Sequence, residues 1–259
     1  MFAPSSRVTT STTFAPHTSG AYPWAVCGRY TNTLGPEEIG KQLGEPLGVK
    51  VRESAGTRRY NIAPTQEVLA IVAPDGQPQT RMLRWGLIPP WAKDLKIGYK
   101  TINARMESVA SKPAYRALIP KASHRALQIA DGYFEWIKPE KRGEPRQPFY
   151  FQLDGGVPFA FAALWTAAHI EGEHIESCTV LTCDSSSNHV VATIHDRMPV
   201  ILADLDVMRA WLDPSVGAAE ALELCGALPA SRMSARPANP AVNKAGGVEG
   251  PGLLVVPAV

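Results

Sequence analysis

The sequence predicts an α+β fold made of a single domain, in which a curved or barrel-like, mostly antiparallel β-sheet is flanked by helices. Two observations support this class. Short β-branched or aromatic runs recur between Gly, Pro and Asp residues, as in a chain of many short strands. Helical patterns are fewer and lie irregularly among these runs, so a regular βαβ repeat is not expected.

Each element follows from a local pattern. Strands are predicted where a short apolar run is bounded by turn residues, over 67–72, 81–87, 126–130, 133–137, 149–153, 159–164, 178–183 and 200–202. Helices are predicted where apolar residues recur with helical spacing, often behind a capping residue. These are 36–43, a turn or two after Arg105, 188–194, 205–212 after Asp204, and 218–224.

Composition narrows the class further. The chain has 259 residues, 45% of them hydrophobic, and its longest apolar runs fall far short of the ~20 residues of a membrane helix. Its cysteines are too sparse and irregular for a disulfide framework or a C-x-x-C metal site, and no glycine-rich phosphate-binding motif is present. We therefore expect a cytoplasmic monomer that uses no metal or other cofactor and does not bind membranes.

Basic residues are concentrated in one segment. Residues 81–125 contain ten Lys and Arg against only Asp94 and Glu107, a net charge of +8, whereas the whole chain carries +2. Such asymmetry is typical of a surface that meets a polyanion such as nucleic acid. A solvated basic face without a partner is the alternative that charge alone leaves open.

Six segments place reactive residues among unusual neighbours. They are CGRY (27–30), NIAPT (61–65), RWGLIPPW (84–91), TINARME (101–107), DGYFEW (131–136) and IHDRMP (194–199), and AVN (241–243) follows them. In this order they resemble the SOS-response-associated peptidase (SRAP) family, whose members act on abasic sites in single-stranded DNA. The resemblance covers about nine tenths of the chain and omits only its N-terminal segment.

The resemblance implies that Cys27 forms a covalent DNA–protein crosslink with the aldehyde of an abasic site, with peptidase and lyase-like activities also implied. A residue with a free amine and a thiol on adjacent carbons can close a thiazolidine ring on an aldehyde. Only an N-terminal cysteine offers both groups. Its amine, with a pKa of ~7.8, is roughly a quarter to a third unprotonated near pH 7.4, against about a thousandth for a lysine.

The segment before Cys27 departs from the family, in which the cysteine directly follows the initiator methionine. Residues 1–25 are rich in Ser, Thr, Pro and Ala and predict a disordered extension, followed by a domain over 26–259. Val26 stands in the place of the methionine, as a GTG start codon would produce. We expect translation to begin at Val26 and the initiator methionine to be removed, so that residues 1–25 are not part of the mature protein. Proteolytic removal of a real leader, or retention of the extension with loss of the crosslinking chemistry, are the alternatives.

The resemblance also assigns the other catalytic positions. Asn103 should orient the ring-opened sugar. Glu135 should act as general acid or base, because partial burial between Phe134 and Trp136 would raise its pKa toward neutrality. His195 suits proton transfer, since its ordinary pKa is ~6.5.

For the DNA strand, the arginines inside the motifs, Arg29, Arg105 and Arg197, suit phosphate, although each could instead form a structural ion pair. The segment from Trp85 through Pro89 to Trp91 predicts an exposed ledge on which an unpaired base stacks, and two core tryptophans flanking a turn are the alternative. Asn61 is a further candidate contact, or only shapes a loop beside the site.

Three functions remain open at this point. The first is covalent capture of abasic sites in single-stranded DNA, with single-strand to duplex junctions as a further substrate. The second is a thiol peptidase or autopeptidase that uses Cys27 with His195 and Glu135, which needs only the thiol. The third is a non-catalytic single-stranded DNA-binding module in which the basic segment alone binds.

Overall fold

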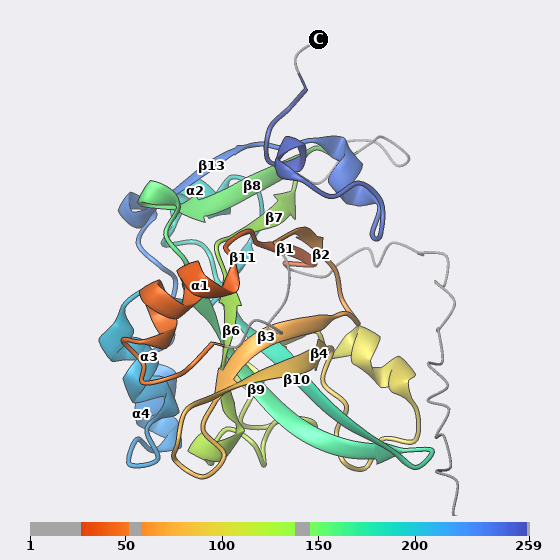
Figure 1. Cartoon of the computed structure of the whole chain (residues 1–259), viewed down its shortest axis with the longest axis vertical. Coiled ribbons are helices and arrows are strands. Elements are labelled where there is room, and N and C mark those ends of the chain that lie inside the picture. The colour runs from red at the N-terminus through yellow and green to blue at the C-terminus, as the bar shows by residue number, and fades with distance from the viewer. Residues whose placement is uncertain (1–26, 52–57, 138–145, 258–259) are drawn as a thin grey trace, which may run out of the picture.

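The computed structural model describes residues 27–51, 58–137 and 146–257 (Figure 1). Within them the chain forms two β-sheets stacked on each other, with short helices along their sides. The α+β class, the single domain and the barrel-like, mostly antiparallel sheet are confirmed. Residues 1–25, for which the sequence predicts an extension, lie outside the described residues.

The lower half of Figure 1 is a closed barrel. Its strands follow the order β10-β4-β3-β6-β9, and β9 pairs back onto β10. All these pairs are antiparallel except β10 with β4. Three short strands extend the barrel wall: β12 pairs with β9, whereas β11 and β5 pair with β10. The bounds are β3 (Glu67–Val72), β4 (Gln79–Trp85), β5 (Asn103–Arg105), β6 (Arg125–Ala130), β9 (Phe159–Ile170), β10 (Glu173–Asp184), β11 (Arg197–Pro199) and β12 (Ile201–Leu202).

The second sheet has five strands, all antiparallel, in the order β13-β8-β7-β1-β2. A layer of aromatic rings joins it to the barrel. The ring of Tyr30 packs edge-on against Trp85 and Phe161, with centroids 5.3 and 5.7 Å apart, and Tyr133 packs edge-on against Phe161 at 6.2 Å. This layer fixes β1 and β7 over the barrel. The bounds are β1 (Arg29–Asn32), β2 (Arg59–Ile62), β7 (Gly132–Trp136), β8 (Pro148–Leu153) and β13 (Met233–Pro237).

Helices are short and lie at the sides of the sheets. They are α1 (Pro36–Ile39), which continues as a π-helical turn over Gly40–Gly44, α2 (His189–Ala192), α3 (Leu205–Leu212) and α4 (Ala218–Glu223). Figure 1 shows α1, α3 and α4 along one side of the molecule. Helix α3 has the predicted bounds, since its buried residues Met208, Trp211 and Leu212 recur with helical spacing. The turns of 3-10 helix are Leu95–Lys100, Met106–Ser108, Ala122–His124, Asp154–Gly156, Ala230–Arg232, Pro240–Asn243 and Pro251–Leu254.

The strand predictions differ from the structure in two ways. Strands β1, β2, β5, β11 and β13 were not expected, because they are short and contain few apolar residues; distant partner strands supply their hydrogen bonds. Strands β9 and β10 are longer than predicted. Their polar ends form a hairpin in which Glu171 and Gly172 both have positive φ, as a two-residue turn of type I′ requires.

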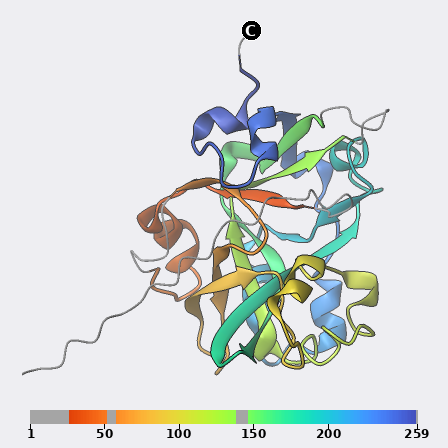
Figure 2. The same cartoon turned by 90° about the vertical axis from the view of Figure 1, so that its right-hand side faces the viewer.

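Strand β5 and the segment that follows it lie beside β10. In Figures 1 and 2 the yellow segment around residue 100 runs along this side of the barrel. Close approach of two glycines shapes the segment. Gly86, at φ +124°, has no room for a side chain, because a Cβ there would lie 2.6 Å from the carbonyl oxygen of Gly98. The chain after β4 is therefore held against the Leu95–Lys100 turn, and this contact places β5 beside β10.

Candidate active site

Cys27 and Glu135 meet where the chain enters β1, beside β7, within the five-stranded sheet. Strands β1 and β7 are antiparallel, with Arg29 opposite Phe134 and Tyr30 opposite Tyr133. The chain immediately before β1 therefore runs alongside Glu135. The main-chain nitrogen of Cys27 donates a hydrogen bond of 2.5 Å to Oε1 of Glu135, and both residues are buried. The pairing of two strands thus brings together two residues 108 positions apart in the sequence.

Burial controls the acid–base behaviour of this pair. It raises the pKa of Glu135 to about 8, although hydrogen bonds from the main-chain N–H groups of Cys27 and Trp136 act in the opposite direction. The rise expected from the neighbouring aromatic residues is confirmed. Burial, with a smaller contribution from Glu135, also raises the pKa of the Cys27 thiol well above its ordinary value. At neutral pH the thiol is protonated, and Glu135 titrates near the working pH.

His195 lies in the turn between α2 and β11. Its Nδ1 accepts a hydrogen bond of 3.0 Å from the main-chain N–H of Arg197, so the neutral ring carries its proton on Nε2. Burial lowers the pKa of His195, and the carboxylate of Asp196, 3.1 Å from Nδ1, partly opposes this. Asp196 also contributes to the raised pKa of Glu135. The imidazole is thus neutral near pH 7, and its loop is electrostatically coupled to Glu135.

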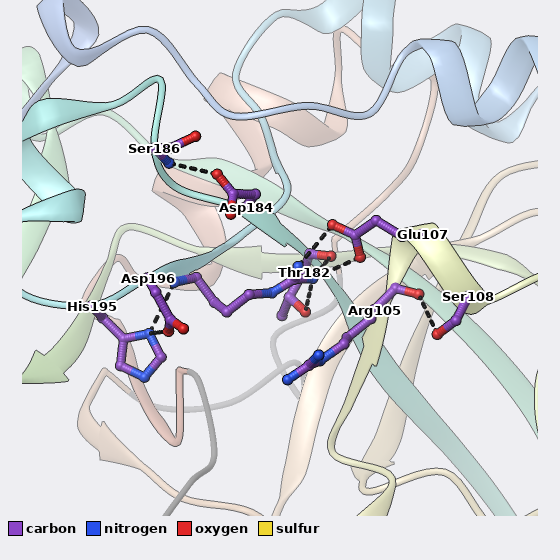
Figure 3. Close-up of polar contacts among 9 residues, drawn as sticks. Arg105, Glu107, Ser108, Thr182, Asp184, Ser186, His195 and Asp196 are labelled. Carbon is purple, nitrogen blue, oxygen red and sulfur yellow. Dashed lines mark hydrogen bonds and ion pairs between the residues drawn. The ribbon is translucent and has the colours of Figure 1, made fainter.

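A groove of about 1030 Å³ runs beside the ends of β5, β10 and β11. Strand register explains which residues share it. Thr182 on β10 is opposite both Arg105 on β5 and Pro199 on β11, so residues from three distant segments come together. Figure 3 shows Arg105, Glu107 and Thr182 close together in this region, with His195 nearby. The side chains that line the groove include Trp91, Lys100, Asn103, Arg105, Glu107, Lys112, Tyr115, Asp184 and Arg197.

The three predicted phosphate ligands have different surroundings. Arg105 is exposed in the groove and forms no ion pair with another described residue. Arg29 is half-buried and donates from Nη1 to the carbonyl of Gly28 at 2.7 Å; burial lowers its pKa. Arg197 is buried and forms a bidentate ion pair with Glu107, at 2.7 and 3.0 Å. Only Arg197 has the structural ion pair that the sequence left as an alternative.

The expectation of a ledge with two exposed tryptophans is wrong for Trp85. Its side chain is 0% exposed, packs against Tyr30 and donates from Nε1 to the carbonyl of Ile102 at 3.0 Å. Trp85 ends β4 with its ring pointing into the core, so it offers no face to a base. Trp91, six residues later, is 58% exposed. Trp91 lines the groove, and it also lines a neighbouring apolar hollow of about 490 Å³. Pro89, which is buried, lines the hollow but not the groove.

Asn61 is also buried, so its side chain has no surface with which to contact DNA. Its Nδ2 donates to the carbonyl of Lys244 at 3.1 Å. The indole N–H of Trp136 likewise donates to Oδ1 of Asn243. These contacts hold the C-terminal AVN segment against β2 and β7, the strand that carries Glu135. Asn61 therefore shapes the surroundings of the site.

Sequence reasoning missed several residues of the groove. Lys100, Lys112 and Tyr115 line it but lie outside or between the recognised motifs, and the hydroxyl of Tyr115 donates to the main-chain oxygen of Asn103 at 3.4 Å. The cluster of positive charge in residues 81–125 was the one sequence feature that pointed to these residues. The same cluster also contains arginines that do not face the groove: Arg81 pairs with Glu176, Arg84 donates to the carbonyl of Thr65, and Arg125 is buried.

The described part of the chain contains neither a membrane-spanning helix nor a cluster of metal ligands. None of its helices is long and apolar enough to cross a bilayer. No three of its His, Cys, Asp and Glu side chains are grouped as metal ligands would be.

The sequence of this chain is similar to those of known proteins. Residues 26–245 match the model of the family described as SOS response associated peptidase (SRAP). The abasic site processing protein YoqW of Bacillus subtilis (strain 168) is 39% identical over 192 residues, which cover 73% of this chain and 81% of YoqW. The abasic site processing protein YedK of Escherichia coli (strain K12) is 29% identical over 84% of this chain and 94% of its own.

Solved structures share the fold. A crystal structure of a protein from Bacteroides thetaiotaomicron matches with a TM-score of 0.74 at 21% identity, over 90% of this chain and all of the other. A phage-related protein from Bordetella bronchiseptica matches with a TM-score of 0.63 at 28% identity, over 82% of this chain and 93% of the other.

Proposed function

Since the chain belongs to the SOS response associated peptidase (SRAP) family, we propose that it captures abasic sites in single-stranded DNA by forming a covalent bond through Cys27. Relatives that are 29% and 39% identical to it over the aligned residues are named abasic site processing proteins. The observation that carries the proposal is the contact between the Cys27 nitrogen and Glu135, a buried carboxyl group whose pKa is about 8. The nitrogen that must attack the sugar thus lies against a proton donor and acceptor.

The chemistry requires that Cys27 be the first residue of the working form. Its free amine attacks C1′ of the ring-opened sugar, and the adduct loses water to give an imine. The thiol then adds to the imine carbon, its proton passes to the imine nitrogen, and a thiazolidine ring closes. In this scheme Glu135, which is protonated at neutral pH because its pKa is about 8, donates a proton to the aldehyde oxygen as the amine attacks. It then takes up the proton that the nitrogen loses and returns it to the departing hydroxyl group, for which a pKa close to the working pH is suited.

Other residues bind the sugar and the DNA strand during this reaction. The neutral His195 exchanges protons with the sugar, and Asn103, on β5 at the wall of the groove, holds the opened sugar. Arg105, Lys100 and Lys112 bind phosphates along the groove. Exposed Trp91 stacks on an unpaired base. Phosphate contacts and stacking do not read base edges, so sequence preference should be weak.

One observation also favours the autopeptidase alternative, as the step that exposes the amine. In a chain extended before Cys27, the nitrogen that Glu135 contacts would be the leaving group of the preceding peptide bond. A largely protonated Glu135 can donate to it while the thiol attacks the preceding carbonyl, and the resulting carboxylate takes up the thiol proton. The bond to nitrogen breaks as a thioester forms, and water then hydrolyses the thioester, which releases the acyl group as a carboxylic acid and restores the thiol. General peptidase activity is less favoured, because the thiol has a raised pKa and is not a thiolate at rest.

The test is an adduct assay with single-stranded DNA that carries one abasic site. Protein beginning at Cys27 should give an adduct that survives denaturing electrophoresis, whereas protein with one additional residue before Cys27 should give none. A heat-stable adduct from the extended variant would overturn the ring-closure mechanism. Intact mass of the protein from its native host then shows whether the working form begins at Cys27.

A further inference from the structure

The ion pair between Arg197 and Glu107 is unusual in its position. It lies on the wall of the groove that also holds Arg105, Lys100 and Lys112. Figure 3 shows Glu107 close to Arg105 and Thr182. Arg197 donates from Nη1 to Oε1 of Glu107 at 2.7 Å and from Nη2 to Oε2 at 3.0 Å. Two parallel hydrogen bonds to two oxygens are the geometry with which a guanidinium group also binds a phosphate.

The two partners are held very differently. The Arg197 side chain is 10% exposed, and its Nη2 also donates to the main-chain oxygen and the hydroxyl of Thr182 at 2.7 and 3.2 Å. The Glu107 side chain is 51% exposed. Thr182 therefore keeps the guanidinium group in place when the carboxylate leaves, and the carboxylate can move into solvent.

The surrounding charges favour an anion at this position. The hydrogen bond from Arg197, with a smaller contribution from the charge of Arg105, lowers the pKa of Glu107, so its carboxylate is charged at neutral pH. Lys100 and Lys112 add two further positive charges to the groove. Asp184 is the other carboxylate that lines it, but Asp184 is exposed and forms no ion pair with a described residue.

We propose that Glu107 is a resident counter-ion, which a backbone phosphate of the bound strand replaces on Arg197. This rests on the proposed binding of single-stranded DNA in the groove. In the free protein Glu107 neutralises the buried guanidinium group. On binding, Glu107 must be displaced, which weakens non-covalent affinity for undamaged strands, so that stable retention depends on covalent capture of a lesion.

The test compares three variants of the full chain for affinity toward an undamaged single-stranded oligonucleotide. Glu107→Gln abolishes the ion pair and removes a charge, whereas Asp184→Asn removes a charge from the same groove without removing a hydrogen-bond partner of Arg197. Glu107→Asp keeps the charge but shortens the side chain, so that it no longer reaches both nitrogens. We expect Glu107→Gln to bind about fivefold tighter than wild type, Asp184→Asn at most about twofold tighter, and Glu107→Asp to lie between wild type and Glu107→Gln.

The position of the phosphate gives a second measurement. One neutral methylphosphonate linkage is moved along the oligonucleotide, and the gain of Glu107→Gln over wild type should disappear at a single linkage. A gain that persists for every linkage, equal affinities of Glu107→Gln and Asp184→Asn, or Glu107→Asp indistinguishable from wild type would each mean that Glu107 acts only through the overall field. Weaker binding by Glu107→Gln would mean that the pair positions Arg197. Each of these results overturns the inference.

The same experiment separates this inference from the proposed function. Wild-type protein that fails to bind single-stranded DNA would remove both. Wild-type protein that binds and crosslinks, with no difference between the Glu107 and Asp184 variants, would remove only the role of Glu107.

Discussion

The two parts of the site differ in their contact with water. Cys27 and Glu135 are buried at the start of β1 and on β7, and burial dominates their pKa values. The groove is open, and its Trp91 and Arg105 side chains are exposed. A buried carboxyl group can hold a proton near the Cys27 nitrogen, whereas an open, basic groove attracts a polyanion without binding it irreversibly. Under the proposed function, the first part carries the chemistry and the second binds the strand reversibly.

The largest effect is expected from Cys27→Ser in protein that begins at residue 27. A serine keeps the amine but replaces sulfur with oxygen, which does not form an equally stable ring. The heat-stable adduct should disappear, whereas borohydride reduction during the reaction should still trap the imine. Affinity for undamaged DNA should stay within about twofold, since the change lies outside the groove. A heat-stable adduct without reduction would show that the thiol is not needed.

A smaller effect on rate is expected from Glu135→Gln, which keeps the shape of the side chain but cannot exchange a proton. Adduct formation should slow by about 10²- to 10⁴-fold, the usual contribution of a general acid–base. Because the Glu135 pKa is about 8, the wild-type rate should fall at alkaline pH as the carboxyl group ionises, and the variant should lack this fall. Single-turnover rates between pH 6 and 9.5 would show it. If the rate of the Glu135→Gln variant also falls at alkaline pH, a group other than Glu135 causes the fall.

Glu135→Gln should also change stability. The folded-state pKa of Glu135 lies above its unfolded value, so the folded chain binds more protons, and stability falls as pH rises from about 4.5 to about 8. The neutral amide removes this loss. Relative to wild type, the variant should gain stability by a few kcal/mol at pH 9 and show no such gain at pH 4, by denaturant unfolding. A difference independent of pH would contradict the buried ionisation.

Substitution of exposed Trp91 and of buried Trp85 separates an effect on DNA binding from an effect on stability. Trp91→Ala should weaken binding of single-stranded DNA by about 1–3 kcal/mol if one base stacks on it. Trp85→Phe should leave affinity unchanged and reduce the free energy of unfolding, because it removes the hydrogen bond to Ile102 and part of a filled core. Fluorescence anisotropy and denaturant unfolding measure the two quantities. Loss of affinity in the Trp85 variant alone would reverse the assignment.

The predictable parts of the fold are those where local pattern and burial agree. Strand β3 and helix α3 have the predicted bounds. The apolar run of β3 is buried along the strand, and the apolar residues of α3 recur with helical spacing on the side of the helix that faces the core. Strands β1, β5 and β11 were missed, although each lies in a recognised motif. Their sequences hold too few apolar residues to indicate a strand, and pairing with β7 and β10 makes them strands. Motifs located the site more reliably than strand patterns did.

The sequence by itself determined the barrel-like class, the family and the residue types at the site, because these follow from short patterns along the chain. Only the tertiary structure decided which residues meet. The Cys27 nitrogen donates a hydrogen bond to Glu135, and Arg197 forms an ion pair with Glu107. Trp85 is buried, whereas Trp91 is exposed. Burial, and with it the pKa of a carboxyl group or the reach of an arginine, depends on neighbours that arrive from distant parts of the chain, which no local pattern contains.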